Sequence, residues 1–191
     1  MSFVPAFEIG IWNAWIFMIW LLIQTVAARL VGKEVYQRGG QPPDMKPSHT
    51  YKIVGYISMP LWLLATLYSI FLPFQLGTIW FSVGLTIFLV GLLMLTVASV
   101  NFAATPMNEP VTRGMYRYSR HPIYMSIFLI YISAGIASVS WIFLLVSIVW
   151  LLLIRLAVDD EERYCLEKYG PSYREYMTRT PRWIGIPTSG A

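Results

Sequence analysis

A histidine followed directly by a proline marks the start of a long apolar run in the second half of the chain. The residues are Arg120-His121-Pro122-Ile123-Tyr124. Proline suits the first turn of a helix, because the N–H that it lacks would have no partner there. Such a start places free backbone N–H groups and the positive end of the helix dipole beside His121, where they attract a carboxylate or a phosphate. The alternative is an interfacial anchor that only begins a membrane helix.

A run of four acidic residues, Asp159 to Glu162, directly follows the last apolar run. Glu161 and Glu162 would point about 100° apart on a helix, so only one of them is expected to face a pocket. A carboxylate in that position suits the hydroxyl pair of a ribose or an ammonium group. Arg155 lies closer to the membrane and is a candidate to hold the anionic head of a substrate. The alternative is that the acidic run forms a solvated helix face.

Several familiar kinds of site have no counterpart in the sequence. There is no glycine-rich phosphate loop, no HExxH spacing and no GxSxG nucleophile elbow. Two histidines and one cysteine cannot build a zinc site alone, so no metal is expected. The single cysteine, Cys165, also excludes a disulfide framework. His49 lies in a polar loop and is expected to be a solvated side chain.

The elements that must position the two polar clusters are membrane helices. Of the 191 residues, 57% are hydrophobic and 13% are charged, whereas a soluble domain carries about 25% charged residues. The net charge of +4 does not indicate nucleic acid, because the basic residues flank apolar runs and no nucleic-acid-binding module is present.

Uncharged runs predict where the helices lie. Ile9–Ala28 is long enough for one crossing of a bilayer. The uncharged run 53–108 is long enough for two, with helices at about 53–72 and about 77–100. Pro73 to Gly77 separates them, because proline and glycine interrupt a helix.

The run 123–154 is too long for one crossing and predicts a helical hairpin that turns near Ser138–Ser140. With five spans, all 14 lysines and arginines lie on one side or at the adjoining helix ends, whereas four spans would divide them. The positive-inside rule therefore favours five spans, with the N-terminus outside and the C-terminus in the cytoplasm. Beyond the hairpin, about 158–168 continues as a helix, Gly170 ends it, and a short helix at about 171–178 follows.

The expected fold is therefore all-α, an integral membrane bundle of five transmembrane helices with a cytoplasmic helical cap. Residues 1–100 form its N-terminal three-helix part and residues 101–191 its catalytic part. Gly77, Gly84, Gly91 and Ala98 recur every seven residues and line one face that permits close helix contact. Packing within one chain is the favoured interpretation, which makes the protein a monomer. A homodimer through Gly77, Gly84 and Gly91 is the alternative.

The ordered set of motifs resembles a known enzyme family. The pattern RHPxY, then EE, then (F/Y)G-x-x-Y-x-x-Y-x-x-x-x-P is matched from Arg120 through Glu161-Glu162 and Tyr169-Gly170 to Pro181. This resembles the isoprenylcysteine carboxyl methyltransferases and the related membrane phospholipid methyltransferases, in their five-span prokaryotic form. The likeness covers roughly residues 100–182.

The resemblance implies S-adenosyl-L-methionine as methyl donor and S-adenosyl-L-homocysteine as product, bound at the cytoplasmic side. Catalytic roles would fall to Glu161 and to Arg155, which takes the place of a family arginine whose own position here is Ala157. The implied cofactor contacts are Asn101, Asn108, Glu109, Pro110, Val111, Tyr116, His121, Pro122, Ile123, Tyr124 and Glu161. The contacts in the strip from Asn108 to Val111 would be made largely through the backbone.

The implied acceptor is lipophilic, most simply the carboxylate of a prenylcysteine-like group that enters from the membrane lipid. Methylation of a phospholipid amine is the first alternative. Membrane sterol reductases, which bind NADPH, share a similar C-terminal region but usually have more spans. A non-enzymatic scaffold is the remaining alternative. A transporter is disfavoured, because no charged residue lies in the middle of the runs 53–108 and 123–154.

Overall fold

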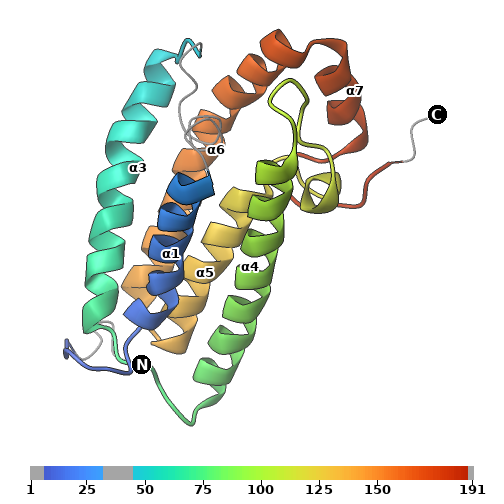
Figure 1. The fold of residues 1–191 in the computed structure, drawn as a ribbon. Helices are drawn as coiled ribbons and strands as arrows, with labels where there is room; N and C mark the ends of the chain where they lie inside the picture. The colour runs from blue at the N-terminus through green and yellow to red at the C-terminus, as the bar shows by residue number, and fades with distance from the viewer. Residues whose placement is uncertain (1–6, 32–44, 189–191) are drawn as a thin grey trace.

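The computed structural model describes residues 7–31 and 45–188, and within these ranges the chain is helical and contains no named strand (Figure 1). Two short 3-10 helices accompany the α-helices. In chain order the elements are α1 (Trp15–Val31), α3 (His49–Tyr68), η1 (Ser69–Phe71), α4 (Ile79–Ala104), η2 (Gly114–Arg117), α5 (Pro122–Ala137), α6 (Trp141–Tyr169) and α7 (Pro171–Arg179).

The helices α1, α3, α4, α5 and α6 form one bundle in which successive helices run in opposite directions (Figure 1). Helices α3 with η1, α4 and α6 are long and apolar enough to cross a membrane, which confirms an all-α membrane protein. Helices α1 and α5 have only 17 and 16 residues. The count of five crossings therefore stays a prediction.

Local sequence explains where most of these helices begin and end. The side chains of Ser48, Thr78 and Ser140 accept hydrogen bonds from the first turns of α3, α4 and α6, as N-caps do. Helices α5 and α6 are joined by residues 138–140, so the predicted hairpin is confirmed. Gly170 ends α6 with φ at 56°, a left-handed conformation that glycine adopts without strain. The expected helices on both sides of Gly170 are also confirmed.

The predicted first helix begins too early. It was expected from Ile9, but α1 begins at Trp15. The Asn13 side chain donates hydrogen bonds to the backbone oxygens of Glu8, at 2.6 Å, and of Ile70, at 2.7 Å. Backbone bonds from Ala14 to Leu72 and from Phe74 to Trp12 hold the same segment against the turn between α3 and α4. These partners, distant in sequence, replace the hydrogen bonds that an extra helical turn would supply.

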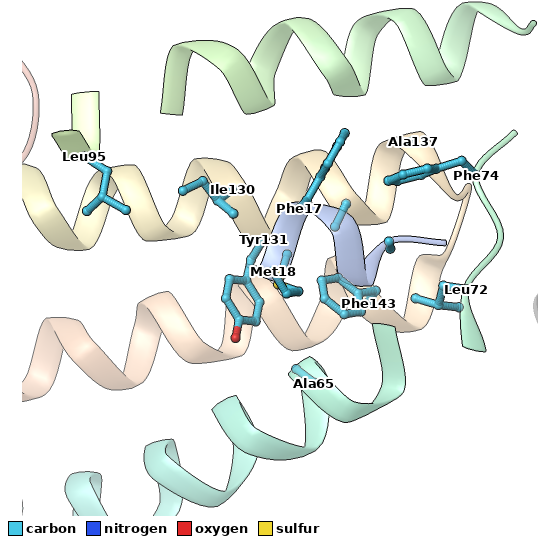
Figure 2. Close-up of a cluster of buried hydrophobic side chains, with 12 residues drawn as sticks. Phe17, Met18, Ala65, Leu72, Phe74, Leu95, Ile130, Tyr131, Ala137 and Phe143 are labelled. Carbon is cyan, nitrogen blue, oxygen red and sulfur yellow. The ribbon is translucent and has the colours of Figure 1, made fainter. Parts of the chain in front are cut away.

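The core lies between α1, α3, α4, α5 and α6 and is rich in aromatic side chains (Figure 2). Phe17 of α1 stacks on Phe88 of α4 with ring centroids 4.0 Å apart. Tyr131 of α5 lies against Phe143 of α6 and hydrogen bonds with Thr66 of α3 at 2.8 Å. These contacts join α1 to α4, and α5 to both α3 and α6.

Helix α5 also covers the glycine face of α4. A Cβ added to Gly84 would lie 2.7 Å from the backbone nitrogen of Ala137, and one added to Gly91 would lie 3.0 Å from the Cβ of Leu129. Gly84 and Gly91 thus pack against α5 of the same chain, while the monomeric state stays a prediction. Gly77 lies before α4, in the turn, with φ at 75°.

Candidate functional site

The bundle brings the two polar clusters together at one end. His121 is the residue before the first turn of α5, and Glu161 and Glu162 lie in the polar end of α6, beyond its uncharged stretch 141–154. The Nε2 atom of His121 is 3.2 Å from Oε1 of Glu162, and its Nδ1 atom is 3.7 Å from Oε2 of Glu161. The imidazole is thus buried between two carboxylates that belong to the same helix.

Glu162 is the buried anion of an ionic network. Its Oε1 lies 2.9 Å from Nε of Arg120, and its Oε2 lies 2.6 Å from Nη2 of Arg182. Burial alone would raise the pKa of Glu162, but the hydrogen bonds from His121 and Arg182 and the charge of Arg120 outweigh it and lower the pKa to about 2. Glu162 is therefore ionised at neutral pH and is held by hydrogen bonds from His121 and Arg182.

Glu161 differs from its neighbour because it faces a pocket. It accepts a hydrogen bond of 2.5 Å from the hydroxyl of Tyr124, and its side chain remains 24% exposed. Burial raises the pKa of Glu161, while the charge of His121 and the hydrogen bond of Tyr124 counteract that rise. Only one of the two glutamates lines a pocket, as the helix geometry predicts.

The pocket beside Glu161 has a volume of about 170 Å³ and an aromatic wall. Helix α7 supplies Tyr173 and Tyr176, and burial raises the pKa of both phenols above the ordinary value. The hydroxyl of Tyr176 donates to the backbone oxygen of Tyr116 at 2.6 Å, which ties α7 to the segment before α5. Met45, just before α3, closes another part of the wall.

A wider hollow of about 850 Å³ adjoins this pocket and shares Pro110 and Tyr176 with it. It lies between the C-terminal end of α4, the loop that follows, and α7. Its lining is polar and carries the charged residues Glu109, Arg113, Arg117, Glu175 and Arg179.

Most of the residues predicted to bind a cofactor lie around these two spaces. Seven line the smaller pocket, namely Pro110, Val111, Tyr116, His121, Ile123, Tyr124 and Glu161. Three line the wider hollow, namely Asn101, Asn108 and Glu109. Pro122 is fully buried at the start of α5 and lines neither space. Arg155 is exposed on α6 and also lines neither, so its catalytic role stays a prediction.

Two residues near the C-terminus contact the site, but they were not predicted from the sequence. Arg182 contacts Glu162, and the ring of Trp183 lies against that of His121 with centroids 6.1 Å apart. No local sequence pattern predicts these contacts, because they depend on how residues 180–188 fold back after α7.

Comparison with known families agrees with this geometry. The phospholipid methyltransferase family model matches residues 74–172, which is more than half of the chain and includes α4, α5, the polar end of α6 and the start of α7. The chain belongs to this family, which includes proteins of the isoprenylcysteine carboxyl methyltransferase type. No curated protein matches it. The protein is therefore a membrane methyltransferase.

Proposed function

We propose that this protein transfers a methyl group from S-adenosyl-L-methionine to a lipophilic acceptor at the membrane surface. The observation that carries the proposal is the meeting of His121, at the start of α5, with Glu161 beside a pocket lined by tyrosines. The residues fit the donor, which combines a carboxylate, an ammonium group, an adenosine and a sulfonium cation.

Each part of the donor has a partner of suitable chemistry. The N-terminus of α5 and His121 suit the carboxylate, because free N–H groups and the helix dipole favour an anion. Glu161 suits the ammonium group or the ribose hydroxyls. The faces of Tyr116 and Tyr124 suit the sulfonium, since aromatic rings attract a cation. Asn101, Asn108 and Glu109 in the adjoining hollow offer polar partners to the rest of the nucleoside.

The first acceptor that we propose is the carboxylate of a prenylcysteine-like group. A carboxylate is ionised near neutral pH, so its oxygen attacks the methyl carbon without a base as the carbon–sulfur bond breaks. The products are a methyl ester and the neutral thioether S-adenosyl-L-homocysteine. The protein would contribute positioning in a pocket that excludes water.

A phospholipid amine is the second acceptor, and membership of the family is compatible with either acceptor. An amine must be neutral to attack, and the product loses a proton, so a base is required when a protonated amine binds. Glu161 is the carboxylate at the pocket that is available for this role. The two acceptors predict different products, because a methyl ester is labile in base and an N-methyl group is stable.

The proposed location of the site is the cytoplasmic side of a membrane, the cell membrane if the source is prokaryotic. The described basic residues from Arg113 to Arg120 and from Arg163 onward lie in or beside the segments η2, the end of α6 and α7, which lie at one end of the bundle (Figure 1). Residues of the same segments line the pocket. Positive residues are retained on the cytoplasmic side, which would place the N-terminus outside. The acceptor would enter from the lipid phase.

Calorimetry with S-adenosyl-L-homocysteine tests the cofactor site directly. Glu161→Gln and His121→Ala are expected to weaken binding at least tenfold, because each removes a charged or polar partner inside the pocket. Glu167→Gln is the matched control, since this glutamate is exposed on the same helix and lines neither space.

Undiminished binding in both folded variants would defeat the site assignment. Binding of NADPH by the unmodified protein would instead support the reductase alternative. An absence of nucleotide binding of either kind would leave the scaffold alternative. Incubation with labelled methyl donor and lipid acceptors, followed by treatment with base, then separates the ester from the amine product.

A further inference from the structure

Residues 180–188, after α7, lie across the segment that leads into α5. The backbone nitrogen of Arg120 donates to the oxygen of Pro181 at 3.0 Å, and that of Gly185 donates to the oxygen of Tyr118 at 3.0 Å. The hydroxyl of Ser119 donates to the oxygen of Arg182 at 3.3 Å. The C-terminal segment and the residues before His121 therefore hold each other in register.

This pairing places the guanidinium of Arg182 over the acidic run of α6. Its Nη1 atom is 2.7 Å from Asp159, its Nη2 atom is 2.6 Å from Oε2 of Glu162, and its Nε atom donates to Oε1 of Glu162 at 3.2 Å. The planar fork of arginine suits such a pair of contacts with one carboxylate. The Oε1 atom of Glu162 is in turn the partner of Nε2 of His121.

We propose that Arg182 is a positioning residue of the cofactor site, acting through Glu162 on the imidazole of His121. The inference rests on the proposed function. An ionised Glu162 accepts a hydrogen bond from the N–H at Nε2. The hydrogen bond made by one ring nitrogen determines the tautomer of the imidazole and the direction in which the other nitrogen points. Nδ1 is then the nitrogen directed toward Glu161 and the pocket. Arg182 orients Glu162, and Trp183 covers the ring of His121.

A purely structural role, in which Arg182 only fastens the C-terminus, makes a different prediction. Arg163 provides the matched control, because it pairs with Asp160, a carboxylate on the same helix that is as buried as Glu162. Asp160 accepts a hydrogen bond from Ser48 and, within the described part of the chain, forms no hydrogen bond or ion pair with His121. Arg163→Gln therefore removes a comparable ion pair without disturbing the histidine.

The first measurement is the affinity of the full-length protein in detergent for S-adenosyl-L-homocysteine. Arg182→Gln is expected to weaken binding about tenfold, which corresponds to the loss of one charge-assisted hydrogen bond. Arg163→Gln is expected to leave the affinity unchanged even where both variants melt at a lower temperature. Arg182→Lys is expected to fall between the unmodified protein and Arg182→Gln, because lysine keeps the charge and loses the fork.

The second measurement is the nitrogen NMR spectrum of the histidine ring, which distinguishes its protonated nitrogens. The chain has two histidines, so a His49→Gln background leaves only His121. In that background the Nε2 signal is expected to be that of a protonated nitrogen bonded to a carboxylate, to change in Arg182→Gln or Arg182→Lys, and to persist in Arg163→Gln.

The inference is overturned if the Arg182 variants keep both the affinity and the ring signals of the unmodified protein. If Arg182→Gln does not fold, Arg182→Lys decides the matter by the same two measurements. Failure of the unmodified protein to bind the ligand would count against the proposed function instead, and the ring spectrum would still test whether Arg182 orients His121.

Discussion

Tyr124 of α5 donates a hydrogen bond of 2.5 Å to Glu161 of α6 and so joins the two helices at the rim of the pocket. The bond directs one oxygen of the carboxylate and leaves the group partly exposed. We expect Tyr124→Phe to weaken binding of S-adenosyl-L-homocysteine by about threefold to tenfold, because Glu161 loses its orienting donor while the ring remains. Tyr56→Phe is the control, since Tyr56 is 80% exposed on α3. Equal affinities in the two variants would contradict this role of Tyr124.

Glu162 should make the free energy of unfolding depend on pH in the acidic range. Its folded-state pKa of about 2 lies below the ordinary value of 4.5, so its stabilisation is complete above about pH 4.5 and disappears as the pH falls toward about 2. The shift corresponds to about 3 kcal/mol at neutral pH. Glu162→Gln should therefore be less stable than the unmodified protein at pH 7, and the gap should close on acidification. Thermal unfolding of both proteins between pH 7 and pH 2.5 measures this difference, and a gap that is independent of pH would refute it.

The contact between α4 and α5 has no room for a side chain at Gly84. Gly84→Ala would place a methyl group against the backbone of Ala137, and the helices would have to separate. We expect a loss of about 1–3 kcal/mol in the free energy of unfolding. Gly55→Ala on α3 is the opposite case, because open space surrounds a Cβ there, and it should stabilise the helix by about 0.5–1 kcal/mol. Denaturation of both variants in the same detergent provides the test, and similar effects of the two substitutions would contradict the packing.

Asn13 should matter more for stability than its place before the first helix suggests. Its buried amide satisfies two backbone oxygens, one of them at Ile70 near the end of α3. Asn13→Ala leaves these oxygens without that donor and should cost about 1–3 kcal/mol. Gln75→Ala, in the exposed part of the neighbouring turn, should have little effect. Comparable melting temperatures for the two variants would show that the amide bonds contribute nothing.

Much of the helical arrangement was predictable, because a helix that crosses lipid must be largely uncharged and long enough to span the bilayer. Uncharged runs and their interruption by Pro73 and Gly77 predicted the bundle helices, and Pro122 predicted the start of α5. The meeting of His121 with Glu161 followed from placing the ends of two neighbouring helices on one side. These inferences depend on local composition and on the length of a helix, both of which the sequence displays.

The features that escaped prediction depend on contacts between distant segments. The start of α1 is set by bonds from Asn13 to Ile70, which no periodicity reveals. Arg182 reaches Glu162 only because the chain reverses after α7. Arg155, proposed as a substrate ligand, is exposed on α6 outside both spaces, and its role stays a prediction.

Helix α6 continues without a break from the apolar stretch to Glu161 and Glu162. At 1.5 Å per residue it is a rod of roughly 44 Å, much longer than the hydrocarbon layer. A rod without a joint transmits the tilt that a thinner bilayer imposes at one end to whatever it carries at the other. We therefore expect the acyl-chain length of the host lipid to influence the tilt of α6, and with it the strain on the bond between Glu161 and Tyr124 of α5.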